Sequence, residues 1–110
     1  MAELKPGFIE QRQHERFDLG VKGVLHTKRM KRSVIIDNIS VKGMKVLSPE
    51  LTIPLEQQLQ INQEVSIEWE SGQKIDALVV WGIGTTAGIF FNNAIGEDHP
   101  LMIRAKANKA

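Results

Sequence analysis

A strict alternation of polar and apolar residues in Glu64–Glu70 is the feature that most limits how this chain can fold. Successive side chains of an extended strand point to opposite faces, so the alternation predicts a half-exposed strand with one buried face. Ser71-Gly72 then has the composition of a tight turn, and a second alternation in Lys74–Trp81 predicts the answering strand of a hairpin. The residues expected on the inner face of this hairpin are Val65, Ile67, Trp69, Ile75, Ala77, Val79 and Trp81.

Further runs of β-branched and aliphatic residues predict four more strands, at spacings typical of a small barrel or sandwich. These runs lie at residues 17–26, 33–37, 44–47 and 87–91. The one helix expected lies within residues 98–109, where Leu101 and Ala105 have helical spacing with Met102 beside them. The sequence therefore predicts an all-β fold, a small six- to seven-stranded antiparallel β-barrel with a short C-terminal α-helix.

The length of 110 residues supports one domain, because a chain of this size buries roughly 60 to 70% of the surface that its unfolded form exposes. Residues 1–11 are expected to form a flexible N-terminal arm, residues 12–96 the barrel, and residues 97–110 the helix and tail. Two prolines interrupt residues 48–63, so this stretch is expected to be a long connection that contains one irregular strand.

The composition narrows the chemistry that the chain can perform. The absence of cysteine excludes disulfides and thiolate metal sites, and the three histidines lack the spacing of metal ligands. No histidine lies beside a plausible nucleophile, so neither a metal site nor an enzyme is expected. No apolar run approaches the ~18 residues of a membrane span, and no apolar stretch after Met1 resembles a secretion signal. We therefore expect a cytoplasmic protein without membrane insertion.

The charges are unevenly distributed, although the net charge is only +1. Residues 1–50 carry ten Lys and Arg against six Asp and Glu, whereas residues 51–110 carry four against seven. An anionic ligand is therefore expected to bind to the first half of the chain.

Two short segments of the first half have side chains suited to such a ligand. Arg12 and Arg16 precede the first strand, and their planar guanidinium forks match phosphate oxygens and the O6/N7 edge of guanine. The segment from Asn38 to Gly43 offers an amide and, at Ser40, a hydroxyl. Each segment alone also fits a structural role, the first as a solvated charge run and the second as an Asx or Ser turn whose glycine has a positive φ.

Together the two segments resemble the PilZ domain, the bacterial receptor module for cyclic di-GMP. The shared pattern is R-x-x-x-R, a strand, and then [D/N]-x-S-x-x-G, and the resemblance extends from about Gln11 to Phe91. Three further segments fit the family pattern: Gly43–Val46, Val79–Trp81 and Gly88–Phe91. The resemblance implies a cyclic di-GMP receptor that changes conformation on binding and regulates a partner protein. Gln11, where family members often have arginine, and Asn38, where Asp is commoner, bear on affinity and on the number of ligand molecules.

The resemblance also implies a ligand site built from both segments. The arginines would clamp guanine and phosphate groups, the amide and hydroxyl would bind a guanine edge, and the glycine would fix the turn. The residues concerned are Arg12, Arg16, Asn38, Ser40 and Gly43. Trp81 would add a flat surface on which a guanine stacks if it lies at the barrel rim, and packing in the core is the alternative.

Two other functions stay open. A PilZ-like module that has lost its ligand would act as a protein interaction module. An RNA- or single-strand-binding barrel is suggested by the basic residues of Lys28–Arg32, which are expected to share one hairpin loop. Such barrels stack bases on exposed aromatic side chains, whereas this chain has two Trp, four Phe and no Tyr. We therefore expect no nucleic-acid partner.

Overall fold

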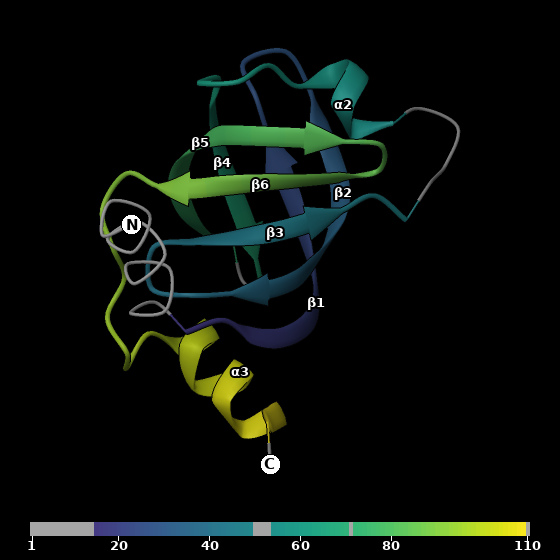
Figure 1. Ribbon diagram of the computed structural model, residues 1–110. Coiled ribbons are helices and arrows are strands. Elements are labelled where there is room, and N and C mark those ends of the chain that lie inside the picture. The colour runs from purple at the N-terminus through teal and green to yellow at the C-terminus, as the bar shows by residue number, and fades with distance from the viewer. Residues whose placement is uncertain (1–14, 50–53, 71, 110) are drawn as a thin grey trace, which may run out of the picture.

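The computed structural model describes residues 15–49, 54–70 and 72–109 (Figure 1). Six strands form a closed antiparallel barrel in the order β1-β2-β3-β6-β5-β4, and pairing of β1 with β4 closes it. The strands are β1 (Phe17–His26), β2 (Lys31–Ile39), β3 (Gly43–Leu47), β4 (Glu64–Trp69), β5 (Gln73–Ile83) and β6 (Thr86–Phe91). The helices are α2 (Leu55–Gln58) and α3 (Pro100–Lys109). The predicted antiparallel β-barrel with a short C-terminal helix is confirmed.

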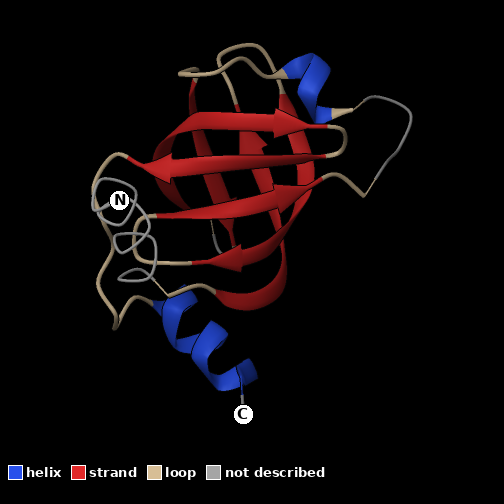
Figure 2. Ribbon diagram, viewed as in Figure 1, coloured by secondary structure: helices blue, strands red, loops and turns tan. Residues whose placement is uncertain are grey.

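The two helices lie at opposite ends of the barrel (Figure 2). Most neighbouring strands are joined by short turns, but β3 and β4 are not paired and the connection between them contains α2. The irregular strand expected in residues 48–63 is not found in the described part of that stretch, which forms the single turn of α2 after Pro54. This turn directs Leu55 into the core, where it is fully buried, and Leu59 is 8% exposed. Burial of these two leucines explains why a helical turn is favoured here.

The core consists of the inward-facing residues of the strands together with one face of α3. The alternation predicted for β4 is confirmed, because its inward side chains are buried. These residues are Val65, Ile67 and Trp69. Helix α3 covers one end of the barrel with the residues predicted from their spacing. These residues, each at most 1% exposed, are Leu101, Met102 and Ala105.

Three strands contain irregularities that change which side chains face outwards. The register shifts between Asp18 and Val21 in β1, between Ile36 and Asn38 in β2, and between Val79 and Trp81 in β5. A bulge adds one residue to one strand of a pair, so the alternation of faces is interrupted there. Such irregularities cannot be located from alternation alone.

Within the described residues, neither helix combines the length and the apolar character that a membrane crossing requires.

Candidate functional site

Ser40 builds the bend between β2 and β3. The residue is 3% exposed, and its Oγ accepts hydrogen bonds from the backbone N–H groups of Lys42 at 3.2 Å and Gly43 at 3.3 Å. The backbone N–H of Ser40 also donates to the carbonyl oxygen of Gly43 at 2.8 Å. Serine side chains commonly stabilise turns in this way. In this structure the hydroxyl of Ser40 therefore orders the bend, and it is directed at the backbone.

Gly43 lies where β3 approaches β6 closely. A Cβ atom at this position would collide with the backbone carbonyl oxygen of Ile89. The φ angle of Gly43 is not positive, so the left-handed glycine of the structural alternative, the Asx or Ser turn, is not found here. Glycine is required here because there is no room for a side chain between the two strands.

The two predicted motifs meet where β1 begins and β2 ends. Pairing of these strands places Asp18 opposite Asn38, and Nη1 of Arg16 donates to Oδ1 of Asn38 at 3.2 Å. Arg16 as a whole is exposed, but atoms of the folded chain displace part of the water around its guanidinium, and this desolvation lowers the pKa of Arg16. An arginine nevertheless stays charged at neutral pH. Arg12 lies outside the described residues.

A row of cross-strand partners continues from Asn38 over the outside of the barrel. Lys45 of β3 lies opposite Asn38, and Gly88 of β6 lies opposite Lys45. Trp81 of β5 in turn lies opposite Gly88. Directly opposed residues of antiparallel strands project from the same face, and this face is the outer one because the next residue of β6, Ile89, is buried in the core. We call Asn38, Lys45, Gly88 and Trp81 the outer row.

A bulge in β5 brings Trp81 into the outer row. Val79 lies opposite Ile89 and is buried, whereas Trp81 lies opposite Gly88, so Val80 is an extra residue that interrupts the alternation. The prediction that Trp81 shares the inner face with Val79 is wrong for this reason. A Cβ atom at Gly88 would collide with the indole of Trp81, which therefore lies across the backbone of Gly88. The indole is half-buried and keeps part of its surface exposed.

Lys45 is a candidate site residue that the sequence did not reveal. Its Nζ lies 3.6 Å from Oδ2 of Asp37, and Nδ2 of Asn38 donates to the same carboxylate oxygen at 3.5 Å. Lys45 lies in a predicted strand, but its position between Asn38 and Trp81 depends on the pairing of β3 with β2 and β6. Together with Arg16, the outer row thus offers two cations, an amide and an indole on one surface.

The prediction that the basic residues of Lys28–Arg32 share one hairpin loop is wrong. The backbone N–H of Thr27 donates to the carbonyl oxygen of Met30 at 2.8 Å, which closes a tight turn, so β2 already begins at Lys31. Arg32 lies within β2 and donates hydrogen bonds to side chains of α2 and of the residue after β3. Only Lys28-Arg29 remain in the turn itself.

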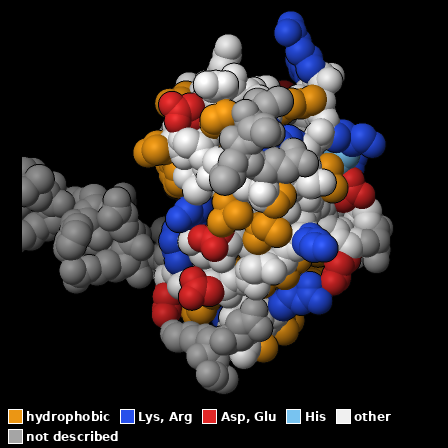
Figure 3. All heavy atoms as spheres, turned by 90° about the vertical axis from the view of Figure 1, so that its right-hand side faces the viewer, with side chains coloured by type: hydrophobic (Ala, Val, Ile, Leu, Met, Phe, Trp, Pro, Cys, Tyr) orange, Lys and Arg blue, Asp and Glu red, His pale blue; other side chains and the backbone are white. Residues whose placement is uncertain are grey.

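Positive charges are also interspersed with other side chains elsewhere on the surface. Figure 3 views the face at the right of Figure 1, where lysine and arginine side chains alternate with acidic and hydrophobic ones. The described part of this face therefore carries no continuous basic stripe of the kind that follows a nucleic-acid backbone.

Comparison with known proteins places the chain in a family. A family model described as the PilZ domain matches residues 10–105. No curated protein matches the chain. In the part of the chain that the structure describes, no group of three or more His, Asp or Glu is arranged to hold a metal ion. Since the family match spans most of the sequence, the chain belongs to the PilZ domain family.

Proposed function

We propose that this protein is a receptor for cyclic di-GMP that regulates a partner protein when the nucleotide binds. PilZ domains are binding and adaptor modules, and the family is known for receptors of this nucleotide. The observation that supports the proposal in this chain is the continuous surface from the Arg16–Asn38 pair along the outer row to Lys45 and Trp81. We therefore assign the ligand to the outside of the barrel, along the outer row that starts at the Arg16–Asn38 pair.

The side chains of this surface match the chemistry of the ligand. Cyclic di-GMP carries two phosphates and two guanines, so a receptor needs cations, a group that reads a guanine edge and a surface for stacking. In the proposed complex the fork of Arg16 binds phosphate oxygens or the O6/N7 edge, and Lys45 neutralises a phosphate as a point charge. Asn38 presents both a donor and an acceptor to a guanine edge. The exposed part of the Trp81 indole stacks on a guanine ring.

Binding requires two local exchanges of partners. The guanidinium of Arg16 has to leave Oδ1 of Asn38, and the ammonium of Lys45 has to leave the carboxylate of Asp37. Contacts of this kind at the surface contribute only about 0–1 kcal/mol, so a doubly charged ligand displaces them readily. The bend held by Ser40 keeps the end of β2 in place during the exchange. The surface is therefore partly assembled before the ligand arrives.

Arg12 extends the proposed site into the segment that precedes β1. If Arg12 and Arg16 both bind the ligand, the complex holds this segment against the barrel and changes the surface that a partner meets. Hydrogen exchange of residues 5–18 is expected to show added protection with saturating cyclic di-GMP. Unchanged protection would contradict this conformational step while leaving binding itself possible.

Calorimetric titration of the full chain with cyclic di-GMP tests the proposal. Arg16→Ala is expected to weaken binding about 10- to 100-fold, because charge-assisted hydrogen bonds contribute about 1.5–3 kcal/mol. Lys74→Ala is the matched control and should bind as the parent does. This variant also removes an exposed cation, but Lys74 lies near the start of β5 and Trp81 near its end. Equal affinities of Arg16→Ala and the parent would refute the site. Absence of binding by the parent would refute the receptor function and favour a ligand-independent interaction module.

A further inference from the structure

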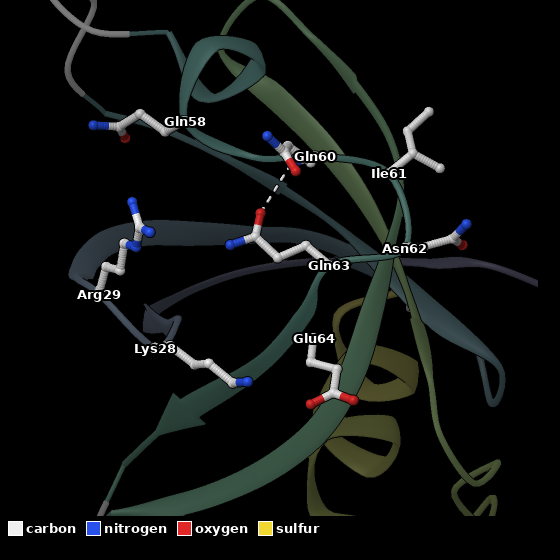
Figure 4. Close-up of a pocket in the computed structure, with 8 residues that line it drawn as sticks. All are labelled: Lys28, Arg29, Gln58, Gln60, Ile61, Asn62, Gln63 and Glu64. Atoms are coloured by element: carbon white, nitrogen blue, oxygen red, sulfur yellow. Dashed lines mark hydrogen bonds between the residues drawn. The ribbon is translucent and has the colours of Figure 1, made fainter.

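A second polar surface lies at the end of the barrel opposite the Arg16–Asn38 pair. It is a cavity of about 490 Å³ beside the β1–β2 turn. The lining residues are Lys28, Arg29, Gln58, Gln60, Ile61, Asn62, Gln63 and Glu64 (Figure 4). Strand β1 begins next to Arg16 and ends at His26, two residues before Lys28, so the pair and the turn lie at opposite ends of this strand. This surface, which we call the turn cavity, shares no residue with the outer row, although its wall is hydrogen-bonded to Val79 of β5, two residues from Trp81.

Two cations line one side of the turn cavity. Figure 4 shows Lys28 and Arg29 on the β1–β2 turn, with the side chains of Gln58, Gln60 and Gln63 across from them. Within the described residues neither cation forms an ion pair. Both charges are therefore available to a ligand.

The amide groups add hydrogen-bond donors to these charges. Oε1 of Gln58 accepts a hydrogen bond from Arg32, and Oε1 of Gln63 accepts one from the backbone N–H of Gln60 at 2.9 Å. Each of these amides therefore retains its NH₂ group as a donor. The only acidic side chain among the described lining residues is that of Glu64, so the two cations leave the lining with a net charge of +1. The turn cavity favours ligands rich in carboxylates and carbonyl oxygens.

The wall of the turn cavity is held in place by the barrel. The backbone N–H of Asn62 donates to the carbonyl oxygen of Val79 at 2.7 Å, and that of Val79 donates to Gln63 at 3.0 Å. Asn62 has a φ of 71°, a left-handed conformation that asparagine tolerates better than most residues. Because this wall is anchored to β5, a ligand does not have to order it on binding.

We propose that the turn cavity binds an extended acidic segment of a partner protein. Carboxylates of the segment meet Lys28 and Arg29, and its backbone carbonyls accept hydrogen bonds from the NH₂ groups of Gln58 and Gln63, which donate to none of the described residues. Ile61 lies at the edge with 64% of its surface exposed and offers an apolar contact to a neighbouring side chain of the segment. No aromatic residue is among the described residues that line the cavity, so stacked nucleic-acid bases fit it less well. The proposal goes beyond nucleotide binding, because it assigns a separate surface to partner recognition.

Fluorescence anisotropy of the full chain with three labelled probes tests the choice of ligand. The probes are a peptide of alternating glutamate and isoleucine, a peptide of alternating lysine and isoleucine of the same length, and an oligothymidylate. The glutamate peptide is expected to bind most tightly, and its affinity should fall as the salt concentration rises. Binding of the glutamate peptide that is no tighter than that of the lysine peptide would overturn the proposal. Tighter binding of the oligothymidylate would overturn it in favour of a nucleic-acid surface.

A double charge reversal locates the binding surface. Lys28→Glu combined with Arg29→Glu is expected to lower the affinity for the glutamate peptide at least about tenfold. Lys22→Glu combined with Lys74→Glu changes the net charge equally at exposed positions outside the turn cavity and should retain most of the affinity. Equal losses in the two double variants would overturn the assignment. Cyclic di-GMP titration of the same samples should be unaffected by the Lys28/Arg29 reversal, so failure of this proposal is distinguishable from failure of the receptor function.

Discussion

The two ends of the barrel present positive charge in different ways. Where β1 begins, Arg16 and Lys45 each contact a polar side chain of β2. At the turn cavity, Lys28 and Arg29 have no ion-pair partner among the described residues. Cations that are already oriented by neighbours suit a small ligand of defined shape, whereas cations without an ion-pair partner in the described structure, lying beside amide donors, suit an extended acidic chain. The comparison teaches that one small barrel can present two groups of cations, at opposite ends of β1, to ligands of different kinds.

The helices that close the two ends differ as well. Helix α3 has ten residues and lies against β1 and β2. The ring of His99, the residue before the helix, contacts Trp69, with the ring centroids 5.2 Å apart. Helix α2 has four residues and places Leu55 in the core. Helix α3 thus lies beside β1, which Arg16 precedes, and β2, which carries Asn38, whereas α2 contacts β5 and β6, which carry Trp81 and Gly88.

The largest expected effect is that of Gly43→Val, which tests whether close strand packing supports the outer row. Because a Cβ atom would collide with the carbonyl oxygen of Ile89, the substitution should lower the free energy of unfolding by about 3 kcal/mol, measured by urea denaturation. Gly82→Ala is the control, because its Cβ would lie 3.5 Å from the Cα of Glu56, and it should change stability by less than about 0.5 kcal/mol. Equal stabilities of the two variants would show that strand approach does not explain the glycine.

Trp81→Leu tests whether the outer row binds a base. Stacking of a base on an aromatic side chain contributes about 1–3 kcal/mol to the binding free energy. The affinity for cyclic di-GMP, measured by calorimetry, should therefore fall about tenfold or more. Phe90→Leu removes another exposed aromatic side chain of the outer surface that lies outside the row, and it should bind as the parent does. If Phe90→Leu lowered the affinity and Trp81→Leu did not, the stacking surface would be assigned to Phe90 of β6 in place of Trp81.

A smaller effect is expected for Lys45→Met, which retains the apolar stem of the side chain and removes its charge. The affinity for cyclic di-GMP should fall about three- to tenfold, and the remaining binding should depend less on salt. Asp37→Asn removes the carboxylate that competes with the ligand for Lys45, so it should raise the affinity slightly. A loss of affinity in Asp37→Asn would show that Asp37 supports the site and does not compete with the ligand.

The smallest effect concerns the start of α3, where Nδ1 of His99 accepts a hydrogen bond from the backbone N–H of Leu101 at 3.1 Å. Burial lowers the pKa of His99 below its ordinary value of 6.5. The negative charge of Asp98 acts in the other direction, but its effect on the pKa is smaller. The folded state therefore favours neutral histidine, and its contribution to stability is complete above pH 6.5 and is lost as the pH falls through the lowered pKa.

Thermal unfolding of the parent and of His99→Asn measures this contribution. The melting temperature of the parent should decrease slightly as the pH is lowered below 6.5. Asparagine can cap a helix but does not titrate in this range, so the variant should show a flatter pH profile. Identical profiles of the two proteins would contradict a role for His99 in the stability of this end.

Residues in regular strands were predicted well from the sequence. Trp69 continues the alternation of β4 and is 5% exposed, and the first strand has the predicted bounds of Phe17–His26. These predictions succeed because the face of a regular strand depends only on the position of each residue along it. Arg16 and Asn38 were also identified together, from the resemblance to a family pattern, and they are in contact.

The predictions that failed concern residues whose environment is set by distant segments. The face of Trp81 is decided by a bulge against β6, and the requirement for glycine at Gly43 comes from the approach of Ile89. The sequence predicts a loop position for Arg32, but this residue lies in β2 and donates to Ser48, sixteen residues further on. No local pattern contains this information, because each contact joins parts of the chain that only folding brings together.

The sequence by itself determined which segments are extended, which faces are apolar and which family the motifs resemble, since these properties depend on residue types and their local spacing. Only the tertiary structure decided that Asn38, Lys45 and Trp81 form one row and that two cations and several amides meet beside the β1–β2 turn. The physical reason is that strand register and bulges are set by hydrogen bonds between distant strands, and a shift of one residue turns a side chain from one face to the other.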